Sequence, residues 1–376
     1  MKFSILLSDI LKPLQEVAGI AGVSSNKDDI TQNVLVKAEQ GRLQLKATDY
    51  NLELEAVLPL ADLQEEGTIT VNAVKLCETL KHLDANSLVS FTSDASREIL
   101  ELKASKTNFE IRTRDAANFP PFEKETEETV IVLKQKQLKE LIDKSKFCIA
   151  VEDFREYLRG MRLEAVDTTL SVFTSDGHRM AILDTQLQAP VKSQFGAILT
   201  KKCADELSKI LDPNADTNIE LKFTKKTVST ELNGFVLSSK LLVCSYPNVR
   251  SVIPKNIETM ISIPTEPLAK SINRVSVMAS KRVNGVSFIF ADNKVMLRSE
   301  NSEHEIATDE LSIDYNGTPL EIALNASYVN EALNATKAQN VFFCFTSPIA
   351  HALVKPESTD GENDVKSMYI ISKVIV

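Results

Sequence analysis

The residues best suited to catalysis or metal binding are few and scattered. The four histidines, His82, His178, His304 and His351, show no spacing at which a helix would present two metal ligands together. The cysteines are odd in number, far apart and free of any CxxC pair: Cys77, Cys148, Cys203, Cys244 and Cys344. This pattern indicates neither a zinc site nor a disulfide framework, and it is typical of a reducing compartment. We therefore expect a cytoplasmic protein without a bound metal.

Asp176 and His178 are the one pair that could act as acid and base. On a strand they would share a face, but the sequence Ser-Asp-Gly-His-Arg at 175–179 favours a tight turn, and no nucleophile stands out beside it. The chain also lacks GxxxxGK[ST] and GxGxxG sequences that would cradle phosphates. An enzyme is thus the weaker interpretation, and we expect no catalytic residue and no cofactor.

The elements that carry these residues recur three times along the chain at an interval of about 125 residues. Helical segments open at Leu11, Leu138 and Leu268, which are 127 and then 130 residues apart. A second helical segment recurs with a predicted N-cap and a glutamate six residues later; the caps are Asn72, Thr200 and Asn325, and the glutamates are Glu78, Glu206 and Glu331. Alternating strands ending in Phe-Thr follow, at 89–92, 219–224 and 341–346.

The period-two alternation and the short connections predict antiparallel sheets with one face exposed to water. Two proline-rich, charged stretches, 118–128 and 245–256, mark the joints, and each holds an aromatic-proline pair, Phe119-Pro120 and Tyr246-Pro247. The sequence therefore predicts an α+β protein of three similar domains, 1–126, 127–254 and 255–376.

Charge is distributed unevenly between the predicted helices and the rest of the chain. The chain carries a net charge of −9, yet the six helical segments 8–19, 72–83, 133–147, 199–211, 265–282 and 325–338 together carry +7. This pattern indicates a basic surface built from helices and an acidic surface built from sheets. No apolar stretch approaches the roughly 18 residues of a membrane span. Asp9 and Lys12 also interrupt the apolar N-terminal run, which makes it a poor signal peptide.

The whole chain resembles the β subunit of bacterial DNA polymerase III, the sliding clamp. The resemblance rests on the opening sequence MKFSILLSDILKPLQEVAG and on YLRGMRLE (157–164), TSDGHRMA (174–181), SKLLVCSYPNVRSVIPKN (239–256), LNASYVNEALNA (324–335) and the final YIISKVIV. The SDGHR turn within a threefold repeat is its most specific part.

The resemblance implies the DNA clamp fold, in which each domain has two helices facing inward and antiparallel sheets outside. Two chains would join head to tail as a homodimer, a closed ring of six domains around double-stranded DNA. Such a ring is a processivity factor: it slides without sequence specificity and tethers the replicative polymerase, the clamp loader and repair proteins through short linear motifs. A monomeric three-domain scaffold that does not encircle DNA is the alternative.

The resemblance also implies a pocket for such motifs between the second and third domains. The matching positions are Leu158, Ser175, Gly177, His178, Arg179, Met180, Pro247, Val252, Ile370, Ser372 and Val374. A pocket lined by Leu, Met, Val and Ile with a few polar anchors suits a leucine or aromatic side chain of a partner. The C-terminal strand departs from the family, which often has Met-Pro-Met-Arg where this chain has Ser372, Lys373, Val374 and Ile375.

DNA contact is expected from basic residues at the helix starts and from the loop after the second domain's first helix. The matching residues are Lys75, Lys136, Lys139, Arg155, Tyr157, Lys201 and Lys202. The family tends to have polar or basic residues near Ser24, Glu152 and Glu156, and the two glutamates would weaken contact with a polyanion.

The dimer interface is expected where a strand edge of the first domain meets the third domain of the other chain. The matching residues are Lys103, Lys106, Phe109 and Ile111 on one side and Val277, Met278, Glu300, Glu303 and Glu305 on the other. Apolar contacts would form the centre of this interface, and opposite charges at its rim would set direction.

Overall fold

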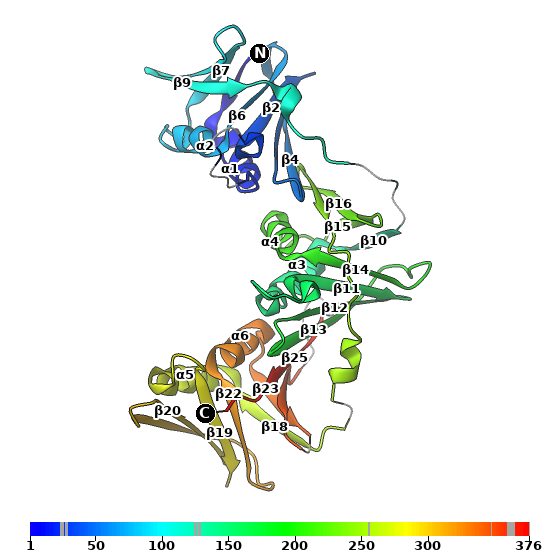
Figure 1. The fold of residues 1–376 in the computed structure, drawn as a ribbon, viewed down its shortest axis with the longest axis vertical. Coiled ribbons are helices and arrows are strands. Elements are labelled where there is room, and N and C mark those ends of the chain that lie inside the picture. The colour runs from blue at the N-terminus through cyan, green and yellow to red at the C-terminus, as the bar shows by residue number, and fades with distance from the viewer. Residues whose placement is uncertain are drawn as a thin grey trace. The chain divides into compact units, whose positions relative to one another are not determined.

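In a computed structural model of the chain, six α-helices and a series of antiparallel strands form the part that the structure describes (Figure 1). That part comprises residues 1–22, 26, 29–123, 126, 129–254, 256–346, 348–358 and 365–375. Ser24 lies outside it. The α-helices are α1 (Leu7–Ala18), α2 (Ala73–Lys81), α3 (Gln135–Asp143), α4 (Lys201–Ile210), α5 (Thr265–Val275) and α6 (Ala326–Thr336). The 3-10 helices are η1 (Ile30–Gln32), η2 (Ala116–Asn118), η3 (Lys146–Cys148), η4 (Glu156–Arg159), η5 (Val249–Val252) and η6 (Ser276–Met278).

Contacts divide the chain into two compact units. The first unit comprises Met1–Ile131, Lys209–Leu211 and Ile219–Leu241. Its strands are β1 (Lys2–Leu6), β2 (Asn33–Glu39), β3 (Arg42–Thr48), β4 (Leu52–Pro59), β5 (Asp62–Glu65), β6 (Gly67–Asn72), β7 (Leu88–Asp94), β8 (Ile99–Ala104), β9 (Thr107–Arg114), β15 (Asn218–Phe223), β16 (Thr227–Leu232) and β17 (Phe235–Lys240). They pair in the order β15-β16-β17-β4-β3-β2-β6-β9-β8-β7-β1-β5.

The second unit comprises Val132–Ser208, Asp212–Asn218 and Leu242–Val376. Its eight-stranded sheet has the order β14-β11-β12-β13-β25-β24-β23-β18, and a four-stranded sheet has the order β21-β20-β19-β22. The strands are β11 (Gly160–Val166), β12 (Thr169–Ser175), β13 (Arg179–Gln186), β14 (Phe195–Thr200), β18 (Thr259–Pro264), β19 (Gly285–Ala291), β20 (Lys294–Glu300), β21 (Ile306–Ser312), β22 (Leu320–Asn325), β23 (Asn340–Phe345), β24 (His351–Pro356) and β25 (Lys366–Ser372). Strand β10 (Thr129–Lys134) and helix α4 run across the boundary in sequence.

The three predicted N-caps are confirmed. The side chain of Asn72 accepts a hydrogen bond from the amide of Lys75, that of Thr200 from Cys203, and that of Asn325 from Tyr328. Each side-chain oxygen therefore satisfies an amide in the first turn of its helix, where no carbonyl of the same helix is available.

Two seams join neighbouring repeats by antiparallel strand pairing. In the first unit, β17 of the second repeat pairs with β4 of the first, with Leu237 opposite Leu54. In the second unit, β25 of the third repeat pairs with β13 of the second, with Met180 opposite Ile370. Because repeats share sheets across these seams, the contacts yield two units from three repeats. The boundaries near residues 126 and 254 stay a prediction.

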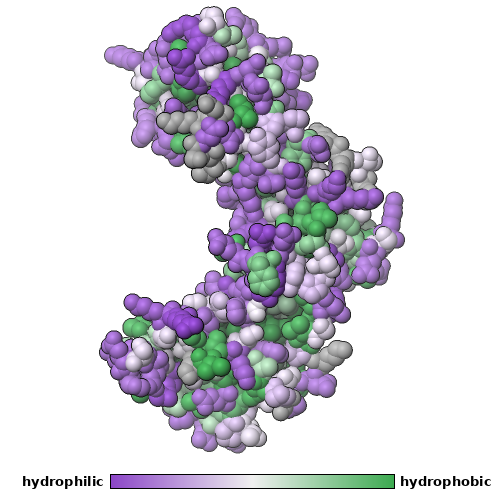
Figure 2. All heavy atoms as spheres, viewed as in Figure 1, coloured by the Kyte–Doolittle hydropathy of each residue, from purple (hydrophilic) through white to green (hydrophobic). Residues whose placement is uncertain are grey.

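The basic charge attributed to the helices lies partly beside them. Helix α3 ends at Asp143, so that Lys134, Lys144 and Lys146 flank it, and α5 ends at Val275, well before Lys281 and Arg282. The helices proper are therefore less basic than the sequence segments suggested. Hydrophilic side chains cover most of the face shown in Figure 2, with separate apolar patches among them. Within the described part of the chain, every helix is too short or too polar to cross a membrane.

Tyr369 stabilises the second seam from inside the core. The side chain is fully buried, and its hydroxyl donates a 3.0 Å hydrogen bond to the carbonyl oxygen of Lys144, just after α3. Tyr369→Phe should lower the free energy of unfolding by about 1–2 kcal/mol, because a buried carbonyl loses its donor. Urea denaturation measures this loss. Tyr50→Phe, at an exposed tyrosine, is the control, and equal midpoints for the two variants would contradict the assignment.

Candidate peptide-binding and nucleic-acid sites

An apolar patch lies across the second seam, on one face of the eight-stranded sheet. Its buried members are Phe173, Ile182, Val249, Cys344, Leu353 and Ile370, with Met180, Tyr246, Ile253, Phe342 and Met368 packed against them and partly exposed. Met180, Ile370, Leu353 and Cys344 stand opposite one another on four successive strands. Side chains on such a row point to the same face, so that both repeats build the patch.

A tight turn at 176–179 borders this patch. The Asp176 carboxylate accepts hydrogen bonds from the amides of His178 (2.9 Å) and Arg179 (3.0 Å). Gly177 has φ of +88°, a left-handed conformation that favours glycine, and an added Cβ would displace the Arg155 guanidinium 2.6 Å away. The predicted turn is therefore confirmed, and it holds Asp176 as a backbone acceptor.

The structure brings several predicted pocket residues together. Met180 and Ile370 form part of the patch, and the amide of Ser372 donates to the carbonyl of His178 (2.9 Å). Val252 ends η5, whose first residue, Val249, packs in the patch. Leu158 is buried in η4, Ser175 is buried beside the turn, and Pro247, Gly177 and His178 are exposed, while Val374 is half-buried.

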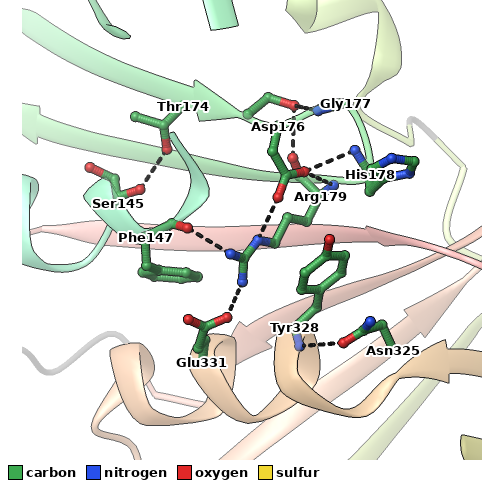
Figure 3. A network of polar contacts seen from close by, with 11 residues as sticks. Ser145, Phe147, Thr174, Asp176, Gly177, His178, Arg179, Asn325, Tyr328 and Glu331 are labelled. Atoms are coloured by element: carbon green, nitrogen blue, oxygen red, sulfur yellow. Dashed lines mark hydrogen bonds and ion pairs between the residues drawn. The ribbon is translucent and has the colours of Figure 1, made fainter. Parts of the chain in front are cut away.

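Arg179 does not line the patch. Alternation along β13 places Arg179 on the face opposite Met180, since successive side chains of a strand point to opposite sides. Its guanidinium extends toward α6 and contacts Glu331, as Figure 3 shows. The side chain of Arg179 therefore lies outside the apolar patch, and its contact with a bound peptide stays a prediction.

In the loop predicted to contact DNA, the charge of Arg155 is compensated by a carboxylate of the same loop. Arg155 makes two 2.9 Å contacts with Asp153, and these hydrogen bonds lower the pKa of Asp153 to about 2. Tyr157 is half-buried in η4, with its ring edge against Tyr246, and is not a buried strand residue. Phe154 is the residue that sequence reasoning missed here: its side chain is 91% exposed. Glu152 and Glu156 are also exposed.

Most of the predicted DNA-binding lysines form ion pairs. Lys136 contacts Asp216 at 2.8 Å, Lys139 contacts Asp143 at 2.9 Å, and Lys201 contacts Asp205 at 4.0 Å. Asp216 also contacts Lys134, and Asp143 also contacts Lys146. Each of these two carboxylates therefore bridges two ammonium groups. Lys202 is half-buried, and Lys75 lies exposed on α2 without an ion pair to any described residue.

The lysines hold the Asp216 carboxylate in its charged form. Hydrogen bonds from Lys136 and then Lys134 lower the pKa of Asp216 below its ordinary value. The carboxylate is thus charged at neutral pH and loses its charge only in acid. Sequence reasoning missed Asp216 because it lies in a loop some 80 residues from its partners.

A cavity of about 750 Å³ lies between α3 and α6. It is lined by Lys136, Lys139, Lys144 and Lys337, with Glu140, Asp143 and Glu331 among them. The ammonium groups are only slightly in excess. The arrangement suits weak contact with a polyanion more than a tight anion site.

The predicted interface residues divide into exposed and buried groups. Lys103 lies on β8, which pairs with β7 and β9 and is therefore not an edge, and Ile111 is only 7% exposed. The side chain of Lys103 is nevertheless 56% exposed, whereas that of Ile111 packs in the core. Both interface assignments stay predictions. Phe109 is half-buried on β9, Lys106 is exposed in the preceding turn, Val277 is 75% exposed in η6, and Met278 is half-buried beside it.

Among the sheet edges of the described residues, two bear on this interface, those on β9 and β21. Strand β9 pairs with β6 only at Thr113 and Arg114, leaving that side of residues 107–112 without a ladder. Strand β21 is the edge of the four-stranded sheet, and Ile306 on it is exposed. Glu300 ends the inner strand β20, and Glu303 and Glu305 lie in the following turn. Sequence reasoning did not include Ile306 among the interface residues. The repeat could have indicated it, because β21 is the counterpart in the third repeat of β4 and β13, which pair at the two seams.

The chain matches three family profiles in succession: the N-terminal domain of the DNA polymerase III beta subunit at residues 1–123, the central domain at 132–248 and the C-terminal domain at 250–369. The beta sliding clamp of Vibrio cholerae is 32% identical over 374 residues, covering 100% of both chains. That of Escherichia coli is 28% identical over 361 residues, covering 96% of this chain and 97% of the other.

Among solved structures, a Pseudomonas aeruginosa sliding clamp bound to griselimycin aligns with a TM-score of 0.93 and 28% identity, covering 100% of both chains. The fold of three domains of antiparallel sheets and helices drawn in Figure 1 is therefore shared with that structure over the full length. The chain belongs to the DNA polymerase III beta subunit family.

Asp216→Asn should strengthen binding to a short DNA duplex, because Lys134 and Lys136 lose the carboxylate that competes with phosphate. Each added phosphate contact should steepen the slope of log K against log salt by about 0.9. Fluorescence anisotropy between about 50 and 200 mM salt measures both effects. Glu39→Gln, which frees Lys37 on β2, is the control. Glu39→Gln should leave binding close to that of the unaltered protein. Unchanged or weaker DNA binding by Asp216→Asn would contradict the prediction.

Proposed function

We propose that this protein is a DNA sliding clamp, the non-catalytic processivity subunit of a replicative DNA polymerase, acting in the cytoplasm. Two chains join head to tail into a ring that encloses duplex DNA. The observation that carries the proposal is the repetition of one seam, β4 with β17 and β13 with β25, which leaves β9 and β21 as its unused halves.

The repeat itself indicates how two chains would meet. Strand β21 stands in the third repeat where β4 and β13 stand in the first two, and β9 stands where β17 and β25 stand. Among the described residues of one chain, neither strand has the partner that its counterparts have. Pairing β9 of one chain with β21 of another would repeat the seam twice and close a heterologous assembly. Phe109 and Ile306 lie on the two strands, and Val277 lies in η6, which packs against β21.

Sliding fits the charge pattern. Lysines already paired with Asp143 and Asp216 attract a polyanion without binding each phosphate firmly. Retention on DNA would then come from enclosure, which needs no base-specific contact. Lys75, Lys136, Lys139, Lys201 and Lys202 remain the proposed DNA contacts, with Arg155 and Tyr157 at the loop.

The apolar patch is the proposed docking site for short linear motifs of the polymerase, the clamp loader and repair proteins. Its partly exposed members, Met180, Tyr246 and Phe342, suit a leucine or aromatic anchor. The pairing of Ser372 with the turn places Ser372 and Val374 at its border.

Encirclement predicts that topology governs release from DNA. After loading onto a nicked circle, the protein should stay bound at a salt concentration that abolishes binding to linear DNA of equal length, and linearising the circle should release it. Gel filtration of the DNA-bound fraction measures retention. Equal retention on both forms would contradict a ring and favour the monomeric scaffold. The mass in solution, expected near twice 41.6 kDa, separates the same two interpretations.

Met180→Ala should weaken polymerase binding about thirtyfold or more, because it removes a central anchor contact from the patch. Removal of residues 372–376 should have a similar effect. Surface plasmon resonance with the replicative polymerase measures the loss, and gel filtration should show an unchanged dimer. Leu88→Ala, at an exposed apolar residue of the first unit, is the matched control. Wild-type affinity in Met180→Ala would remove the patch assignment.

A further inference from the structure

The sheet at the second seam carries apolar side chains on one face and a charged side chain on the other. Met180, opposite Ile370, belongs to the apolar patch on one face. Arg179 stands on the other face, where its guanidinium reaches Glu331 and Tyr328 of α6. Directly behind the patch, Arg179 therefore adds a side-chain link between the same two repeats that the β13–β25 ladder joins.

The guanidinium of Arg179 is fully engaged within the protein. Its Nε donates to Asp176 (3.0 Å), one Nη donates to Glu331, and the other donates to the carbonyl of Phe147 (2.7 Å). The rings of Tyr328 and Phe147 lie 4.2 and 5.2 Å away. The side chain is only 10% exposed, and a buried charge of this kind is stable only when paired. Figure 3 shows these partners converging from the turn, η3 and α6.

The turn itself does not require an arginine. In the first repeat the Asp49 carboxylate accepts from the amides of Asn51 and Leu52, as Asp176 does from His178 and Arg179. Tyr50 there has a positive φ, like Gly177. A buried leucine, Leu52, thus occupies the position of Arg179 in a turn of the same construction.

Each repeat has a glutamate at the helix position that Arg179 contacts. Glu78 and Glu331 both stand six residues after the N-cap, but the described ion pair of Glu78 is with Lys81 on its own helix (2.8 Å). Arg179 therefore adds something that turn closure does not need, a connection between the turn and the inner helix of the next repeat.

We propose that Arg179 is a positioning residue for ligand binding: with Glu331 and Tyr328, it fixes α6 behind the β13–β25 seam so that the apolar patch is preformed. This rests on the proposed docking function. A patch built from two repeats changes shape when those repeats shift, and a preformed surface avoids the ordering cost on binding. Glu331, which lies on the opposite side from the patch, thereby contributes to affinity without touching the ligand.

The test compares Arg179→Met, Arg179→Lys and Glu331→Gln with Glu78→Gln as the matched control. The probe is a fluorescein-labelled nine-residue peptide with a central Leu-Phe pair, and anisotropy gives its Kd. We expect affinity to fall about tenfold in Arg179→Met and about threefold in Glu331→Gln, with partial recovery in Arg179→Lys and wild-type affinity in Glu78→Gln. In the unliganded proteins, amide hydrogen exchange at residues 177–182 and 368–372 should be faster in Arg179→Met and Glu331→Gln than in the unaltered protein. Arg179→Lys should not show this increase.

The two readouts separate the possible failures. Wild-type affinity in Arg179→Met and Glu331→Gln, at a temperature where both are folded, would overturn the proposal even if exchange is faster, because the contact would then serve stability alone. If the unaltered protein does not bind the probe, the docking function fails. Unchanged exchange at the seam in Glu331→Gln would overturn the positioning role independently of any ligand.

Discussion

The structure depends on one constraint, that neighbouring repeats join through the edges of their β-sheets. Each internal boundary between repeats meets it in the same way, by an antiparallel pairing that turns two edges into one continuous sheet. Three repeats have only two internal boundaries, so that one edge of each kind is left over, on β9 and β21. The head-to-tail association that we propose would therefore reuse the pairing that already joins the repeats within one chain.

The same pairing decides where other functions can lie. A strand shared between repeats presents alternate side chains to two faces, and along β13 these faces carry an apolar patch and a buried charge. The patch is continuous across the seam because its two halves are held in register by backbone hydrogen bonds. The lysines near α3, in contrast, are restrained by Asp143 and Asp216, which favours mobile contact with a polyanion over firm binding.

Local features were predictable from the sequence, and contacts between distant segments were not. The caps at Asn72, Thr200 and Asn325 and the turn at Asp176 follow from residue types within four positions. The orientation of Arg179 could have been deduced from strand alternation, once Met180 was assigned to the patch. The pairing of Lys136 with Asp216 depends on how a loop folds back over some 80 residues, and no pattern encodes it. The burial of Ile111 and the paired state of β8 likewise become visible only when strand order is known.

The second seam also limits how early during synthesis the fold can be completed. Strand β13 begins at Arg179, and its partner β25 begins at Lys366, so the ribosome must add more than a repeat of further chain before the two can meet. Contacts of such sequence separation form slowly. Through that interval the nascent chain exposes an apolar, hydrogen-bonding edge to every neighbouring polypeptide. Until the third repeat emerges, the edge of β13 is therefore open to pairing with a strand of another chain.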